Sequence, residues 1–330
     1  MTFDQRVVAI ASKGYTDRQA RFLVTVLLHS GVCMVRQYCE FSGIARGQKT
    51  QDFFSALVAR KHASFTTDPY QRTRIFHVQH RSLYEAIGQE NNRNRKPVPV
   101  GAAIERLMLL DAVIGSRDLD WLATEQDKLA HFTRMFGTTI RREELPRLVF
   151  GEPPRTTTRY FPDKLPIGVS SDGQLRVFTF LVTGDDARDF RKFLQRHAEL
   201  LRGLPAWRVR LLIPAHLAPA RQAYLSAFQQ ELLSPMRLSA AVDLQWFFET
   251  QRAGSDGAMA DQERFLRARR AFGTPRFRML YQRWLTEGNR SLGDISSPVI
   301  ADAITRGSGK VEAHVLPHPY FHLRTLVGTA

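Results

Sequence analysis

Cysteine is scarce in this 330-residue chain, and long apolar runs are absent from it. Cys33 and Cys39 are its two thiols, and their spacing of six residues matches no zinc-binding pattern. Two thiols also make no disulfide framework of the kind that staples small secreted domains. No apolar run approaches the roughly 20 residues that cross a bilayer, and the first residues lack the apolar core of a signal peptide. We therefore expect a cytoplasmic protein without a membrane partner.

Motifs for cofactors and metals are also missing. There is no glycine-rich phosphate loop and no serine-nucleophile motif. His314, His318 and His322 are spaced by four residues, which on a helix would place them on one face, but Pro317 and Pro319 forbid a regular helix there. In a strand, the even spacing would put all three on one side. A metal site is the alternative to exposed or packed histidines, and we expect no metal and no cofactor.

Acidic residues are in the minority. The chain has 47 Lys and Arg against 32 Asp and Glu, a net charge of +15 and a pI near 10.4. Residues 1–100 hold 15 Lys and Arg against 7 Asp and Glu, whereas the rest holds 32 against 25 over more than twice the length. Because Lys and Arg neutralise phosphates, this denser positive charge favours a nucleic-acid partner for the N-terminal part. A generally Arg-rich proteome is the alternative explanation, but it would spread the charge more evenly.

The segment from residue 16 to residue 79 carries the most informative pattern. Thr16 and Gln19 form a capping box, and an apolar stripe at helical spacing follows it to Leu28. Glycine, turn chemistry and β-branched residues then mark further elements. The pattern predicts helices at about Met34–Phe41 and Arg46–Arg60 and strands at Ala63–Thr67 and Arg74–Gln79. Three helices and a hairpin in this order are typical of a winged-helix DNA-binding domain.

Such a domain suggests where DNA would bind. A helix fits the major groove, where polar residues of its first turns meet base edges, and a hairpin tip can reach a neighbouring groove or the backbone. We therefore expect double-stranded DNA as the partner. The candidate contact residues are Arg46, Gln48, Lys49, Thr50, Gln51, Arg60 and Lys61 on the third helix, with Tyr70, Arg72 and Arg74 on the hairpin. The alternative is a winged helix that contacts proteins, with these charges merely solvated.

Beyond residue 89 the chain predicts a basic linker and then a mixed α/β region. The linker is the polar stretch 89–99, and it precedes helical stretches at 101–115 and 118–135. Strands at 165–169 and 175–182, joined by a tight turn, are followed by a helix, a strand and a helix at 185–202, 207–213 and 219–233. The apolar stretch 238–248 ends this unit as a further strand. Residues 262–284 are helical with a break at 273–275, and 311–327 are β-like.

The pattern resembles the replication-relaxation family of plasmids and integrative elements. The similarity lies in the Arg18–Leu28 helix, the Thr50–Lys61 helix with its hairpin, and the basic linker. It continues in Pro162-Asp163, the strand Arg176–Val182 and the helix with Lys192, which look like that family's nuclease-like domain. The resemblance covers residues 16–215. It implies DNA binding in replication, mobilisation or transcriptional control of a mobile element.

A nuclease of the PD-(D/E)xK type needs more than Asp163. Its next strand carries an acid and, two positions on, a lysine; carboxylates hold Mg²⁺ and the lysine positions the attacking water. Here that strand reads Val177-Phe178-Thr179-Phe180-Leu181, with neither. Asp185 and Asp186 follow the strand and are expected to cap the next helix. We therefore expect no enzyme activity and a degenerate sheet used for dimerisation or partner binding.

These inferences combine into an α+β, multidomain protein. We expect a winged-helix domain at 1–90, a basic linker and helical segment at 91–155, an inactive α/β nuclease-like domain with a small mixed sheet at 156–250, and a helical and β-like extension at 251–330. The expected function is sequence-selective DNA binding by a nucleoid-associated homodimer that regulates transcription of a mobile element. The alternatives are a metal-dependent nuclease or relaxation enzyme and a plasmid replication or mobilisation accessory protein.

Overall fold

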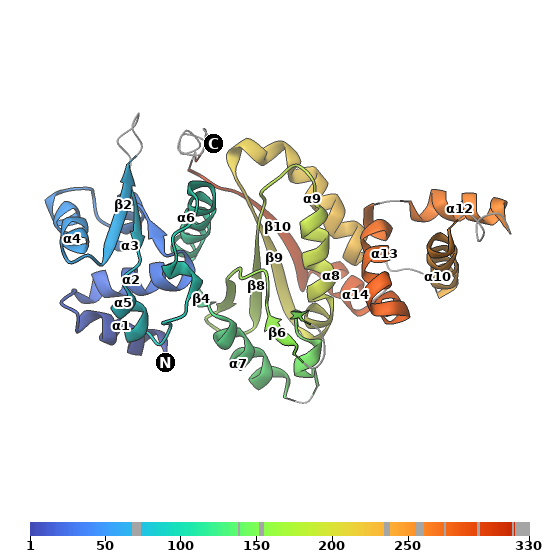
Figure 1. Ribbon diagram of the computed structural model, residues 1–330, viewed down its shortest axis with the longest axis horizontal. Coiled ribbons are helices and arrows are strands. Elements are labelled where there is room, and N and C mark those ends of the chain that lie inside the picture. Colours follow the sequence, from blue (N-terminus) through green and yellow to red (C-terminus); the bar gives the residue numbers. More distant parts are fainter. Residues whose placement is uncertain are drawn as a thin grey trace.

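The chain folds as an elongated α+β protein, with its N-terminal helices at one end, a mixed sheet in the middle and a group of helices at the other end (Figure 1). The computed structural model describes residues 1–67, 74–137, 139–151, 155–233, 238–254, 261–273, 275–295, 298–318 and 320. Within these ranges, no helix is both long and apolar enough to span a membrane.

The N-terminal part combines helices with a three-stranded antiparallel sheet. The strands lie in the order β1-β3-β2, so the short β1 extends the hairpin formed by β2 and β3. Phe76 of β3 lies opposite Phe65 on one side and Cys33 on the other. The elements are α1 (Phe3–Ala11), α2 (Asp17–His29), β1 (Val32–Cys33), α3 (Val35–Ser42), α4 (Gln48–Ala59), β2 (Ala63–Thr67), β3 (Arg74–Val78) and α5 (Arg81–Ala86).

Local capping signals determine where these helices begin and end. The capping box predicted at α2 is confirmed, since the Thr16 hydroxyl accepts from the Gln19 N–H and the Gln19 side chain accepts from the Thr16 N–H. Gly43 ends α3 in the left-handed region, with a φ of 63°. The predicted strands match β2 and β3 to within one residue. Helices α1 and α5 were not predicted, although a second capping box, Thr2 with Gln5, opens α1.

Residues 89–99 are not a free linker, contrary to the prediction. Asn94 is buried, and its Nδ2 donates to the carbonyl oxygens of Leu27 and Leu28, both at 3.1 Å. Gly31 has a φ of +71°, and a Cβ on it would lie 2.3 Å from the Asn94 carbonyl oxygen. The polar Asn94 in this stretch therefore has a structural role, because it satisfies carbonyl groups at the end of α2 that have no helical partner.

The central sheet has the strand order β10-β9-β8-β7-β4. β8, β9 and β10 are parallel, whereas β7 and β4 pair antiparallel at one edge. Strand β4 precedes the range 156–250 expected for this domain and β10 follows it, so the sheet gathers strands from a longer stretch of chain. The elements are η1 (Arg93–Arg95), α6 (Val100–Gly115), β4 (Leu119–Leu122), β7 (Ile167–Ser170), β8 (Leu175–Leu181), β9 (Ala206–Ile213) and β10 (Gly309–Val315).

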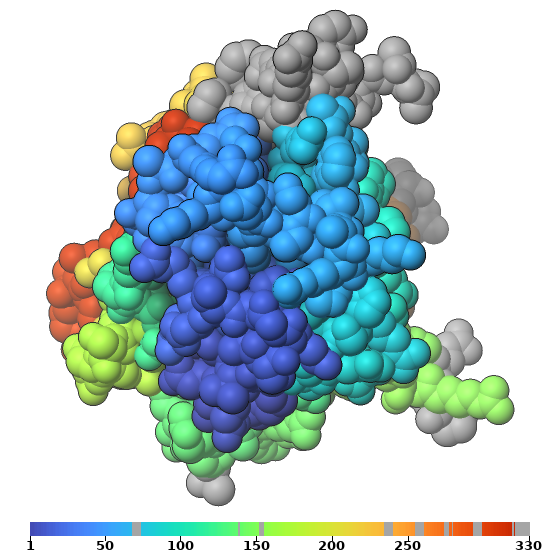
Figure 2. All heavy atoms as spheres, turned by 90° about the vertical axis from the view of Figure 1, so that its left-hand side faces the viewer, coloured from blue at the N-terminus to red at the C-terminus, as the bar shows by residue number. Residues whose placement is uncertain are grey.

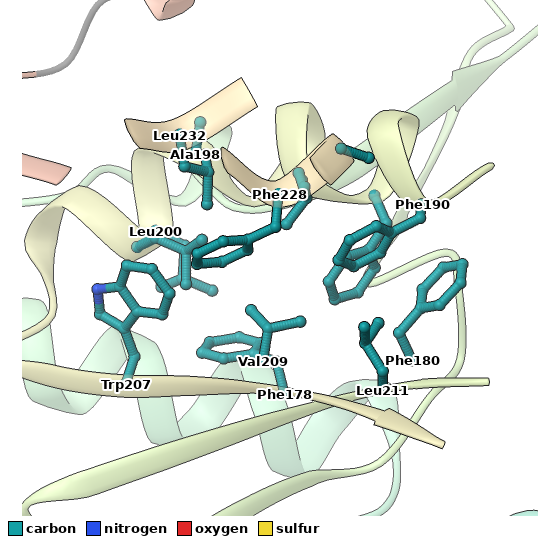
Figure 3. Packing of buried hydrophobic residues seen from close by; sticks show 14 of the residues in the cluster. Phe178, Phe180, Phe190, Ala198, Leu200, Trp207, Val209, Leu211, Phe228 and Leu232 are labelled. Atoms are coloured by element: carbon teal, nitrogen blue, oxygen red, sulfur yellow. The ribbon is translucent and has the colours of Figure 1, made fainter. Parts of the chain in front are cut away.

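Helices cover both faces of this sheet. On one face, α8 (Arg188–Gly203) and α9 (Arg221–Phe228) pack onto β8 and β9, with Phe228 close to Trp207 and Phe190 close to Phe180 of the strands (Figure 3). The helix predicted at 185–202 corresponds to α8, whose buried apolar residues face the sheet. On the other face lies α6, whose apolar residues form a cluster with Leu212. Because α6 also contacts α2, α3 and β1, it joins the N-terminal part to the sheet.

One predicted element was wrong in type and another was wrong over its first residues. Residues 238–248, expected as a strand, belong to the helix α10 (Leu238–Ala253). The helix expected at 118–135 begins only at α7 (Glu125–Phe136), because Leu119–Leu122 form the edge strand β4. Short apolar runs fit a buried strand and a buried helix equally well, so periodicity did not separate the two.

The remaining elements lie at the edges of the sheet and at the far end of the molecule. Around α10, the side chains of Leu244, Phe248 and Trp284 form a separate small core. The predicted break at 273–275 is confirmed, since one helix ends at Phe272 and the next begins at Pro275. The elements are η2 (Arg142–Glu144), β5 (Arg147–Phe150), β6 (Thr157–Tyr160), η3 (Ala215–Ala220), η4 (Gln229–Leu233), α12 (Gln262–Phe272), α13 (Pro275–Glu287), η5 (Gly288–Ile295) and α14 (Pro298–Thr305).

Candidate nucleic-acid interface

Four of the ten expected contact residues lie at the N-terminal end of α4, with Arg46 just before its N-cap Gly47. Arg46, Gln48, Lys49 and Gln51 are all exposed there. The ion pairs of the described residues involve other side chains, so no carboxylate lies within 4 Å of Arg46 or Lys49 in this part of the chain. Gln48 is partly engaged, because its Nε2 donates to Asp52 Oδ1 at 2.7 Å. Two cations and one unengaged amide therefore lie together at a helix N-terminus, where backbone N–H groups also favour anions.

Thr50 does not belong to this surface, contrary to the prediction. Its side chain is buried, and its hydroxyl donates to the Gly47 carbonyl oxygen at 2.6 Å while accepting from the Gly47 N–H at 3.0 Å. Gly47 is the N-cap of α4 and offers no side chain of its own. Thr50 therefore closes the first turn of the helix, and it positions its neighbours without facing solvent.

Arg60 and Lys61 lie at the opposite end of α4. The Arg60 guanidinium donates to the carbonyl oxygens of Lys13 and Gly14 at 3.3 and 3.2 Å and stacks 5.1 Å from the centroid of the Tyr15 ring. These contacts tie α4 to the turn between α1 and α2. Lys61 is exposed and has a φ of +57°, so it closes the helix in the left-handed region.

The hairpin contributes one described contact candidate. Arg74 is exposed at the start of β3, and its guanidinium lies 4.7 Å from the centroid of the Phe65 ring on β2. Phe65 is itself 41% exposed, which is unusual for an aromatic side chain on a strand. Tyr70 and Arg72 lie outside the described residues. Figure 2 looks onto this end of the molecule, where the lighter blue atoms of residues from about 35 to 67 lie above the darker atoms of α1 and α2.

A dense aromatic core holds α4 in place. Phe53 and Phe54 on its inner face are buried, and the Phe53 ring lies 4.6 Å from that of Tyr38 on α3. Phe54 lies 4.4 Å from Phe76 of β3. Aromatic pairs at such separations stabilise beyond the area they bury. The exposed face of α4 is therefore carried on a rigid support that includes the hairpin.

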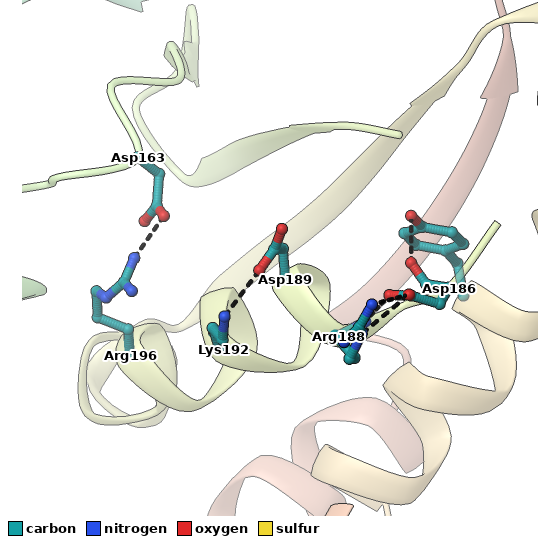
Figure 4. A network of polar contacts seen from close by, with 7 residues as sticks. Asp163, Asp186, Arg188, Asp189, Lys192 and Arg196 are labelled. Carbon is teal, nitrogen blue, oxygen red and sulfur yellow. Dashed lines mark hydrogen bonds and ion pairs between the residues drawn. The ribbon is translucent and has the colours of Figure 1, made fainter. Parts of the chain in front are cut away.

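The nuclease-like centre predicted around Asp163 is occupied by an arginine. The Asp163 carboxylate forms an ion pair with Arg196 of α8, and Lys192 pairs with Asp189 at 3.0 Å (Figure 4). Asp186 accepts from the N–H of Arg188, the first residue of α8, although the N-cap position expected for Asp185 or Asp186 is held by Ala187. Arg196 pairs with Asp163 Oδ1, whereas Oδ2 is buried without a hydrogen-bond partner, and β8 brings no second carboxylate to it.

Two buried ionisable groups lie behind Asp163, and no pattern in the sequence indicated them. Lys128 donates to the Leu165 carbonyl oxygen at 2.6 Å, and burial lowers its pKa to about 8. Burial also lowers the pKa of His197 to about 4. Both line a cavity of about 10 Å³ together with Asp163 and Thr179, which is room for roughly one water molecule. A substrate of nucleotide size does not fit, so these groups serve the core.

A second cluster of ionisable groups connects three distant segments. Asp111 of α6 is buried; Arg36 of α3 donates to both its carboxylate oxygens, at 2.8 and 2.7 Å, and Gln37 Nε2 donates at 2.8 Å. The Tyr320 hydroxyl donates to the same carboxylate. Burial and the Asp111 charge raise the pKa of Tyr320 far above its usual range, so the phenol remains a donor.

The same cluster is the place where a metal could be considered. Glu40, Asp111 and His318 offer ligand atoms within 4.8 Å of one another. His318 is one of the three regularly spaced histidines; His314 is exposed on β10, and His322 lies outside the described residues. Four donated hydrogen bonds already satisfy the Asp111 carboxylate, two of them from a guanidinium. A cation would have to displace Arg36, so the residues fit an ion-pair network better than a metal site.

Comparisons with known protein families, with curated proteins and with solved structures find no match for this chain. What this chain can bind is therefore inferred from the geometry described above.

Proposed function

We propose that the N-terminal part is a winged helix that binds double-stranded DNA, with α4 as the helix that enters the major groove and the β2–β3 hairpin as the wing. The observation that carries the proposal is the exposed N-terminal end of α4. Lys49 and Gln51 project from its first turns, Arg46 lies just before the N-cap Gly47, and buried aromatic side chains hold the helix from behind. Arg and Lys donate to guanine and to phosphates, and Gln pairs with adenine, so these types suit both direct readout and backbone contact. Arg74 on the wing supplies a further phosphate contact.

Net charge and its distribution support a polyanionic partner. The excess of +8 within residues 1–100 comes from 15 Lys and Arg against 7 Asp and Glu. Binding that relies on phosphate neutralisation weakens steeply with salt, because counterions are released from the DNA. The proposal therefore predicts a strong dependence of affinity on salt concentration.

The test is a set of single substitutions measured by fluorescence anisotropy over a range of salt concentrations. Arg46→Ala, Lys49→Ala and Arg74→Ala should each weaken DNA binding and reduce the slope of log K against log salt by about 0.9 for each phosphate that is no longer neutralised. Arg221→Ala, which removes an exposed charge from α9, serves as the charge-matched control and should change neither quantity. Unchanged affinity and slope in all three variants would refute the proposed DNA-binding surface.

We further propose that the protein acts as a homodimeric transcriptional regulator of a mobile element in the nucleoid. A dimer would read two half-sites and so gain specificity, and a strict monomer by light scattering, with and without DNA, would count against it. A replication or mobilisation accessory role uses the same DNA surface. Genome-wide mapping of bound sites separates the two, because promoters indicate regulation and an origin indicates the accessory role.

We propose that the α/β part has no nuclease activity. What supports this is the pairing of Asp163 with Arg196 and the absence of acids from β8. A plasmid-nicking assay with Mg²⁺ or Mn²⁺ is the direct test. Cleavage that is lost in Asp163→Ala would overturn the proposal in favour of a metal-dependent nuclease or relaxation enzyme.

A further inference from the structure

A pocket lies where the three parallel strands of the sheet end. β8, β9 and β10 end level with one another, since Leu181 pairs with Leu212, and Val315 pairs with Ile213. The chain segments that leave these strand ends supply one side of the pocket, and α6 supplies the other. In sheets of this kind, the carboxyl ends of parallel strands are the usual place for ligands.

The pocket has the size and the lining of a small-molecule site. Its volume is about 380 Å³, near the lower end of the range of roughly 300–1,000 Å³ for such sites. Its floor is apolar and buried, and is formed by side chains that include Ile104, Met108, Val182 and Pro214. The rim is polar, with Glu105 on the α6 side and Thr183 after β8. An amphipathic ligand would match this division.

Glu105 determines which charge the ligand should carry. It is the sole carboxylate in the lining, which also holds the imidazole of His216, and the described residues place no Lys or Arg nitrogen within 4 Å of it. The residue lies at the rim, yet neighbouring atoms desolvate its carboxyl group and raise its pKa. A cationic ligand group would pair with this carboxylate, whereas an anionic group would be repelled.

We propose that this pocket binds a small amphipathic amine, with the apolar body against Ile104, Met108 and Val182 and the ammonium group donating to Glu105. The ligand class follows from the lining and does not rest on DNA binding. If the protein is a DNA-binding regulator, this site gives it an effector. Binding can be measured on the protein alone, so failure of this proposal is distinguishable from failure of the proposed DNA surface.

The experiment uses the full chain and two probe pairs, the members of each pair sharing the same arylethyl group. 2-Phenylethylamine and tryptamine are compared with 3-phenylpropionate and indole-3-propionate by thermal shift and titration calorimetry at pH 7. The amines should raise the melting temperature and saturate with dissociation constants below about 1 mM. The acids should do neither.

Two variants distinguish binding in the pocket from nonspecific binding elsewhere on the protein. Glu105→Gln keeps the shape of the side chain, and it should weaken amine binding at least about tenfold because a charge-assisted hydrogen bond is lost. Glu90→Gln, which removes an exposed carboxylate outside the pocket, should leave binding unchanged. The proposal is overturned if neither amine binds, if the acids bind as well as the amines, or if Glu105→Gln binds as tightly as the parent chain.

Discussion

Replacing Asp111 tests whether its buried carboxylate holds the molecule together. The side chain of Asp111 is 4% exposed and that of Arg36 is 30% exposed. Truncation to alanine would leave Arg36, Gln37 and Tyr320 without their shared acceptor. Removing one partner of a buried ion pair costs about 3–5 kcal/mol, and the partial exposure of Arg36 places the expected loss near the lower end. We therefore expect Asp111→Ala to lower the free energy of unfolding by about 3 kcal/mol.

The measurement is urea unfolding followed by circular dichroism and tryptophan fluorescence. Tyr320→Phe removes a single hydrogen bond to a charged group and should cost about 1.5–3 kcal/mol. The double variant should cost less than the sum of the two single variants, because they share one interaction. Asp118→Ala, at an exposed position three residues beyond the end of α6, should stay within about 0.5 kcal/mol of the parent. A loss below about 1 kcal/mol in Asp111→Ala would refute the view that this network stabilises the fold.

Three further substitutions test other parts of the structure. Gly31→Ala should destabilise by about 2 kcal/mol or more in thermal unfolding, since its φ of +71° and its closeness to Asn94 both oppose a side chain. Because burial lowers the pKa of His197 to about 4, the neutral ring stabilises the fold above pH 6.5, and that contribution is lost as the pH falls toward 4, by about 1.4 kcal/mol per pH unit. His197→Phe should flatten this decline between pH 7 and pH 5, and an unchanged decline would assign it to other groups. Thr50→Val should lower stability by about 1 kcal/mol and leave the salt dependence of DNA binding intact. Lys49→Ala should do the opposite, changing the salt dependence but not the stability. Urea unfolding and fluorescence anisotropy measure the two effects.

The sequence predicted those elements whose boundaries depend on nearby residues. The capping box of Thr16 with Gln19 and the tight turn at Gly173, with its φ of +67°, are local signals, and both are present in the structure. The pairing of β10 with β9 is different in kind, since Gly309 lies opposite Trp207 about a hundred residues away. Only tertiary packing selects such a partner, and for the same reason the apolar stretch that became α10 could not be assigned correctly.

The candidate interface likewise combines features that local sequence predicts with features that only tertiary packing determines. Exposure of Lys49 and Gln51 follows from helical periodicity and was predictable, whereas Arg46 lies before the N-cap Gly47. The burial of Thr50 was not predictable, because it depends on Gly47 having no side chain to cap the helix. The Asp111 network was harder to predict from the sequence, because its members are separated by 75 and 209 residues. An acid within an apolar helix is the signal that could have revealed it, because a buried carboxylate requires a partner.

Helix α3 links the two halves of the molecule. Toward α4, Tyr38 packs against Phe53, and toward α6, Arg36 and Gln37 bind Asp111. Tyr320, which lines the proposed amine pocket, donates to that same carboxylate. A ligand that shifted Tyr320 would remove one charged hydrogen bond from the support of α3, an effect of about 1.5–3 kcal/mol, which matches the coupling of about 1–3 kcal/mol typical of allosteric proteins. If both proposals hold, binding of the amine could act on the exposed turn of α4 through Tyr320, Asp111 and α3, without any contact between ligand and DNA.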